Sequence, residues 1–173
     1  MSVSGRGQQG GMLVEVMLVV LVAAVLAAAA FPGVCKVYRQ AAVEYEAEHL
    51  LADIRRCQSL SRVTGSSAWN YGADTSADTF VHVVLEKGKY TMLAGNMKII
   101  DSHAYLAGIK AVKEDKKSYS AKADIAFSQE GTPRSVESMM TIFIYYQGYE
   151  QEGRRIMISK GGRIRMERGR HEG

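Results

Sequence analysis

A single apolar run near the start of the chain constrains its architecture more than any other feature. Residues 12–31 carry one charge, Glu15, and are otherwise almost entirely valine, leucine, alanine and methionine. Residues 11–35 make up a stretch of 25, whereas a helix needs about 20 apolar residues to cross the ~30 Å core of a bilayer. The sequence therefore predicts one membrane-spanning helix close to the amino terminus.

Three interpretations of this run compete. A buried helix of a globular domain would have a polar face, and residues 16–31 show none. A cleaved secretory signal would use the alanines at 28–30 as its cleavage site, but its leader has only Arg6 as a basic residue and Glu15 interrupts its apolar part. A membrane anchor must account for Glu15, because an intramembrane carboxylate is costly and usually functional. The simpler alternative is that Glu15 has no function and that its side chain reaches the interface between membrane and water.

Residues 10–20, Gly-Gly-Met-Leu-Val-Glu-Val-Met-Leu-Val-Val, resemble the class III signal of type IV prepilins. The resemblance implies that a prepilin peptidase cleaves after a glycine, with glutamate fifth and proline twenty-second in the mature chain. Cleavage between Gly10 and Gly11 gives Glu15 and Pro32 these positions, and cleavage after Gly11 gives neither. The family usually has phenylalanine where this chain has Gly11, so it departs from the pattern there. Methylation of the Gly11 amine by the same peptidase is also implied.

Cleavage would create an α-ammonium on Gly11, one helical turn from Glu15. Glu15 of the same or of a neighbouring chain can pair with it, aided by the positive end of the helix dipole. The resemblance implies the pairing between subunits, which sets the register of each subunit in a filament. Pro32 lacks a backbone donor and predicts a kink or partial melting at the membrane exit. A cytoplasmic leader, residues 1–10, and a carboxyl-terminal domain outside the cytoplasm are implied as well.

Beyond Gly33 the pattern becomes that of an amphipathic helix. Apolar residues recur every three or four positions, and we assign the charged residues between them to its solvated faces. We expect a transmembrane helix over 11–35, a stem helix over 36–64 and an end at Gly65. The stripe consists of Val43, Ala47, Leu50, Ile54 and Cys57, and the charged residues are Glu44, Glu46, Glu48, Asp53, Arg55 and Arg56.

The remaining residues, 65–173, are typical of an antiparallel β head. Expected strands cover 79–85 and 89–93 around a turn at 86–88, then 124–128, 141–146, and 154–159 and 163–166 around a turn at 160–162. The interval 101–122 is ambiguous, with a surface loop expected at 114–117. The predicted fold class is α+β: a long amino-terminal helix packed against a β head.

Three segments are similar to the GspH/FimT pseudopilins: residues 51–60, residues 125–128 ahead of Gly131, and residues 155–165. The resemblance implies two β-sheets on a long helix, and a minor pilin or pseudopilin of a type IV pilus or type II secretion pseudopilus. Implied partners are the prepilin peptidase, other pilin subunits, the inner-membrane assembly platform and membrane lipid. The implied location is the inner membrane, spanned once, and then the filament.

Residue patterns for catalysis or for a cofactor are lacking. The four histidines, His49, His82, His103 and His171, have no metal-ligand spacing. Cys35 and Cys57 lie about 33 Å apart along one helix, beyond the ~7 Å limit for a disulfide. The sequence contains no phosphate-binding loop, dinucleotide fingerprint or nucleophile elbow. We therefore expect no enzyme activity, no metal and no cofactor.

The basic carboxyl terminus favours a second function. Residues 153–173 hold seven basic and two acidic residues, a net +5, against −1 for residues 1–152. The alternating order of residues 163–166 places two arginines on one face of a strand, and more follow. FimT-like members are associated with DNA binding in natural transformation through a Gly-Arg-x-Arg tail, which residues 162–165 match. DNA binding for DNA uptake is the alternative function, and a charged edge strand is the simpler interpretation. The candidate DNA-binding residues are Arg163, Arg165, Arg168 and Arg170.

Overall fold

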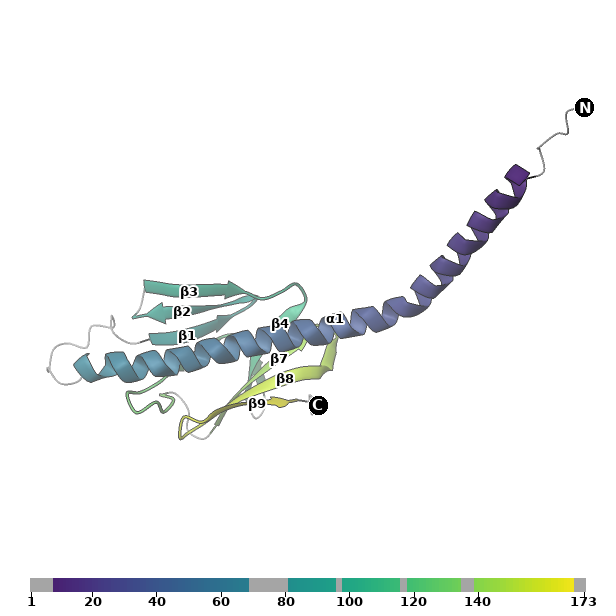
Figure 1. The fold of residues 1–173 in the computed structure, drawn as a ribbon. Helices are drawn as coiled ribbons and strands as arrows, with labels where there is room; N and C mark the ends of the chain where they lie inside the picture. Colours follow the sequence, from purple (N-terminus) through teal and green to yellow (C-terminus); the bar gives the residue numbers. More distant parts are fainter. Residues whose placement is uncertain (1–7, 69–80, 96–97, 116–117, 135–138, 170–173) are drawn as a thin grey trace, which may run out of the picture. The chain divides into compact units, whose positions relative to one another are not determined.

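The computed structural model describes residues 8–68, 81–95, 98–115, 118–134 and 139–169. These form one helix and nine strands (Figure 1). The chain divides into two compact units, Met1–Arg39 and Gln40–Gly173, of which the second is the head and includes the second half of the helix. The elements are α1 (Gln8–Ala68), β1 (Val81–Glu86), β2 (Lys89–Ala94), β3 (Lys98–Ala104), β4 (Ile109–Asp115), β5 (Ser118–Ser120), β6 (Ala123–Ala126), β7 (Met139–Tyr146), β8 (Tyr149–Ser159) and β9 (Ile164–Arg168).

Helix α1 is the single helix of the described residues that is long and apolar enough to cross a membrane. The large apolar side chains of its first half, from Met12 to Val34, are all exposed. The residues on both sides of Pro32 are helical, so partial melting there was a wrong expectation; a proline costs one hydrogen bond locally, and the flanking turns keep theirs. It also continues past Gly65 to Ala68, because one glycine near a helix end costs only about 1 kcal/mol.

The strands of the head form two antiparallel sheets among the described residues. One has the order β3-β2-β1-β6 and the other β5-β4-β7-β8-β9. Figure 1 shows β1–β3 along one side of α1 and β7–β9 along the other. The expected turns at 86–88 and 160–162 are both present: Glu86 pairs with Lys89 across a two-residue turn, and Ser159 and Gly162 close the second turn.

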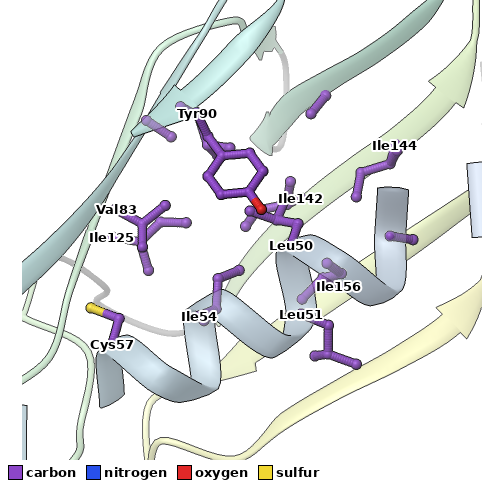
Figure 2. Close-up of a cluster of buried hydrophobic side chains, with 14 of the residues drawn as sticks. Leu50, Leu51, Ile54, Cys57, Val83, Tyr90, Ile125, Ile142, Ile144 and Ile156 are labelled. Carbon is purple, nitrogen blue, oxygen red and sulfur yellow. The ribbon is translucent and has the colours of Figure 1, made fainter. Parts of the chain in front are cut away.

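The core lies where α1 meets both sheets. All five residues of the expected stem stripe are at most 1% exposed, which confirms the predicted packing face. Figure 2 shows Leu50 and Ile54 of α1 surrounded by side chains from the strands. Val83 and Ile125 come from the first sheet, and the second supplies apolar residues that are equally inaccessible: Ile142, Ile144, Ile156 and Ile158.

The strand assignments differ from the sequence expectation most clearly at β4 and β8. Glu114 and the residue after it belong to the end of β4 rather than to a surface loop, and Arg155 Nη2 lies 3.0 Å from Glu114 Oε1. Residues 116–117 lie outside the described part of the chain. Strand β8 begins at Tyr149, five residues earlier than expected, because Tyr146 and Tyr149 pair across a two-residue turn in which Gly148 has φ +83°.

Candidate functional sites on the anchor and the head

The residues expected to direct processing and assembly lie on one stretch of helix. Gly10, Gly11, Glu15 and Pro32 all belong to α1. Glu15 is exposed among exposed apolar neighbours, such as Val14 and Val16. The described residues offer it no ion pair or hydrogen bond within the chain. Any partner for this carboxylate therefore comes from outside the described residues.

Arginine side chains of the tail do not form one continuous strip. Arg163 and Arg165 are exposed, whereas Ile164 between them packs partly against the core, so the expected alternation is present. Glu167 lies on the arginine face, however, and its Oε1 is 3.4 Å from Arg165 Nε. Arg168 is three residues from Arg165 in the same strand and so belongs to the opposite face. Arg170 lies outside the described residues.

A hollow of about 490 Å³ opens beside β8 and β9. Glu152 and Arg154 of β8, Arg168 of β9 and Gln40 of α1 line it. Arg154 and Arg168 face each other directly across the two strands, and Arg154 forms an ion pair with Glu44. The spacing of these residues in the sequence gave no sign of this hollow, because Gln40 and Arg168 are brought together only by the fold.

A second polar cluster joins α1 to the first sheet, and the sequence pattern did not predict it. Glu46 and Asp53 were expected on solvated faces, but they are 0% and 8% exposed. Glu46 accepts hydrogen bonds from the Leu106 amide at 2.9 Å and from His103 Nε2 at 2.8 Å. Those partners make the burial of the carboxylate tolerable. A usable signal was present, since Glu46 and Asp53 each precede a residue of the buried stripe by four positions, one full helical turn.

The same cluster contains a chain of short hydrogen bonds and stacked rings. The Tyr90 hydroxyl donates to Asp53 Oδ2 at 2.6 Å and lies 2.5 Å from His49 Nδ1. The rings of His49 and His103 stack with centroids 4.1 Å apart. Burial, with the hydrogen bond to Asp53 next, raises the pKa of Tyr90 well above its usual range. Tyr90 therefore stays protonated and keeps its role as a donor.

Gln58 of α1 ties two turns of the head together. Its Nε2 donates to the carbonyl oxygens of Gly131 and Gly162, each at 2.7 Å. Both glycines have positive φ angles, +80° and +79°. Each turn adopts a backbone conformation that favours glycine, and one side chain fixes both in place.

These clusters have the character of structural polar networks. Within the described residues no group of three or more histidine, cysteine, aspartate or glutamate side chains is arranged to hold a metal ion. Each buried carboxylate in the cluster has a hydrogen-bonded partner in the chain.

The comparisons with known proteins bear on the fold. No protein-family model matches the chain, and no curated protein sequence does. Solved structures do match, and two of them illustrate the likeness. The type IV minor pilin FimU of Pseudomonas aeruginosa is 20% identical over 72% of this chain and 91% of its own, with a TM-score of 0.51. The minor pseudopilin EpsH from the type 2 secretion system of Vibrio cholerae is 13% identical over 73% of this chain and 96% of its own, with a TM-score of 0.50. The chain therefore has the fold of these pilins, a long amino-terminal helix packed against an antiparallel β head, as the sequence predicted.

Proposed function

We propose that this chain is a minor pilin or pseudopilin, a membrane-anchored structural subunit of a type IV pilus or of a type II secretion pseudopilus. The observation that carries the proposal is the first half of α1: a fully exposed apolar surface with one carboxylate that has no partner among the described residues. Such a surface is stable only in lipid or against other apolar helices. The membrane provides the lipid environment first, and a filament of packed helices then provides the contact with other apolar helices.

Glu15 sets the axial position of each incoming subunit during assembly. Cleavage between Gly10 and Gly11 by a prepilin peptidase leaves an ammonium group within one turn of this carboxylate. In an apolar surrounding an unpaired charge is costly, so the ammonium of one subunit and the Glu15 carboxylate of the next attract each other strongly. The pair forms only at the correct axial offset, and the incoming subunit is therefore placed by one residue.

The path of the chain to the filament begins in the inner membrane. The leader, residues 1–10, stays in the cytoplasm, α1 spans the bilayer once, and the head lies outside the cytoplasm. The assembly platform of the inner membrane and other pilin subunits then take the chain into the filament. Methylation of the Gly11 amine would keep the positive charge and add apolar surface, which suits a buried position.

DNA uptake is the weaker alternative. Arg163 and Arg165 are exposed, as phosphate binding requires. Glu167 lies on their face and pairs with Arg165, however, and Arg168 belongs to the other face of β9. Neither FimU nor EpsH is described as a DNA-binding protein. No observation in the described residues favours DNA capture over a charged edge strand.

Processing of the chain in its native membrane tests the proposal. Mass spectrometry of the extracted protein is expected to find a chain that begins at Gly11, and methylated there. A chain that begins at Phe31 would instead identify a secretory signal and overturn the proposal.

The Glu15→Ala variant tests assembly separately. It is expected to be cleaved and inserted like the parent chain, because loss of a charge favours insertion, but to be absent from sheared filaments. Val19→Ala removes an exposed apolar group of the same helix and serves as the matched control, which is expected to enter filaments. Normal recovery of Glu15→Ala in filaments would contradict the role of the carboxylate.

A further inference from the structure

The hollow beside β8 and β9 contains a carboxylate oxygen that lacks a partner. Glu152 is half-buried and lines the hollow. Its Oε2 is inaccessible to solvent and has no hydrogen-bond partner among the described residues. Such atoms are rare in native proteins, because a buried polar group without a hydrogen bond costs free energy. A donor that enters the hollow from another molecule would remove this cost.

The arginines that line the hollow do not supply this donor. Arg154 pairs with Glu44 of α1, and its Nη1 donates to the Gly153 carbonyl at 3.3 Å. Arg168 is exposed, so water solvates its guanidinium and it needs no place in the hollow. Glu152 therefore remains an acceptor without a donor in the described part of the chain. An ammonium group suits it well, because it has three donors and carries the opposite charge.

A lysine lies at the other end of the same hairpin. Lys160 belongs to the turn between β8 and β9, which the Gly162 amide closes by donating to the Ser159 carbonyl. Lys160 is exposed and forms no ion pair with any residue that the structure describes. Gly161, the next residue, is exposed as well, and a Cβ there would meet no atom within 4 Å. The tip of this hairpin is therefore open to a partner.

The tip and the hollow are too far apart to meet within one chain. Glu152 lies in β8, and Lys160 follows the end of that strand. At 3.3 Å per residue of strand, the two are about 26 Å apart. Helix α1 gives a similar separation: Gln40 lines the hollow and Gln58 binds the Gly162 carbonyl, and the helix between them is about 27 Å long. Lys160 can therefore reach Glu152 only in another copy of the chain.

We propose that Lys160 of one subunit inserts into the hollow of a second copy and pairs with Glu152 there. The contact is heterologous, because each copy offers its hairpin tip to one neighbour and its hollow to another. A heterologous contact that does not close into a ring produces an open row of subunits. The inference rests on the proposed function only in that subunits of a filament meet copies of themselves. It adds a contact between the heads of neighbouring copies.

The test uses the full chain in maltoside micelles. Unlabelled and ¹⁵N-labelled chains are mixed and treated with a carbodiimide, which joins an ammonium and a carboxylate in direct contact through an amide bond. Peptide mass spectrometry is expected to find Lys160 linked to Glu152, including pairs in which one peptide is labelled and the other is not. Absence of this link at about 1 mM chain, or a link without such mixed pairs, would overturn the proposal.

Exchange of the two charges separates this pair from non-specific attraction. Glu152→Lys and Lys160→Glu are each expected to weaken self-association more than about tenfold, because like charges then meet in the hollow. Sedimentation equilibrium in density-matched micelles measures the effect. A mixture of the two single variants, and the double variant that carries both changes, are expected to recover the association. Failure of both to recover it would contradict a direct pair between these residues.

A matched control comes from another hairpin. Lys87 is an exposed lysine beside a glycine in the turn between β1 and β2, and Lys87→Glu is expected to leave self-association unchanged. Circular dichroism checks the fold of each variant, and Lys160→Glu tests the contact even if Glu152→Lys is unfolded, because it alters only an exposed turn. Equal association of Lys160→Glu and Lys87→Glu would exclude the tip as the partner of the hollow. The micelle experiments need neither cleavage nor filament entry, so their failure would leave the proposed function intact.

Discussion

Glu46 Oε2 on α1 lies 2.8 Å from His103 Nε2 on β3, and the Glu46 side chain is fully buried. The same carboxylate accepts the Leu106 amide through its other oxygen. A residue of the helix thereby fixes both an edge strand and the loop that follows it. The described part of α1 has no other carboxylate that is as inaccessible to solvent.

Glu46→Ala is expected to lower the free energy of unfolding by about 2 to 4 kcal/mol, because it leaves the Leu106 amide and His103 without their acceptor and opens a cavity. Glu46→Gln keeps one acceptor oxygen and should cost less. Urea unfolding followed by circular dichroism measures both. Glu48→Ala, at an exposed position two residues away, is expected to change stability by less than about 0.5 kcal/mol. An equal effect of the two alanine variants would show that the buried contacts contribute nothing.

Gly162→Ala is expected to be strongly destabilising. Gly162 has φ +79°, and a Cβ there would lie 2.1 Å from the Gly131 carbonyl oxygen. Both the backbone conformation and the contact oppose a side chain, so we expect a loss of more than about 2 kcal/mol. Gly161→Ala is the adjacent control, because a Cβ at Gly161 would meet no atom within 4 Å. Thermal unfolding of the two variants should separate them by at least several degrees.

Local periodicity accounts for what the sequence predicted well. The stripe from Val43 to Cys57 repeats at helical spacing, and every member is buried. The turn at 86–88 could be predicted because glycine lies between two runs of strand-forming residues. Such signals are complete within about fifteen residues, so a single sequence is enough to find them.

Long-range partners account for what the sequence did not reveal. In the sequence Glu46 and Asp53 look like solvated charges. Their partners His103 and Tyr90 lie 57 and 37 positions further along the chain, and only the fold brings them together. The first half of β8 was missed for a related reason: residues 149–153 are mostly polar, and they join the strand through the pairing of Tyr149 with Tyr146 of β7. The hollow depends on Gln40 and Arg168 together, which lie at opposite ends of the head sequence.

Cys57 is expected to resist alkylation in the folded chain. The side chain is fully buried, and burial raises the pKa of its thiol to about 12. At pH 8 only about one thiol in 10⁴ would be ionised, and the thiolate is the reactive form. Iodoacetamide followed by peptide mapping should therefore label Cys57 at least 100-fold more slowly in the native chain than in urea. Rapid labelling of Cys57 without urea would mean that α1 separates readily from the strands.

Gln58 offers a test of how the two glycine turns are held. Its Nε2 donates to Gly131 and Gly162, and no carboxylate can replace these donations. Gln58→Glu is therefore expected to cost about 2 to 4 kcal/mol at pH 7, because an ionised carboxylate would face two carbonyl oxygens. Below about pH 4 the introduced carboxyl group is protonated and can donate one hydrogen bond, so the difference from the parent chain should narrow as the pH falls.

The amides at which hydrogen exchange becomes faster show whether Gln58 holds the two glycine turns in particular or stabilises the head as a whole. The Gly162 amide donates to the Ser159 carbonyl at 2.9 Å inside one of the two turns. In Gln58→Ala, amide hydrogen exchange of Gly162 should accelerate more than that of core residues such as Ile156, because the turn loses its tether while the sheet remains paired. Ser59→Ala, an exposed neighbour on α1, should change neither rate. Uniform acceleration across the head would instead mean that Gln58 supports the whole fold, and that the turns are not fixed by this side chain in particular.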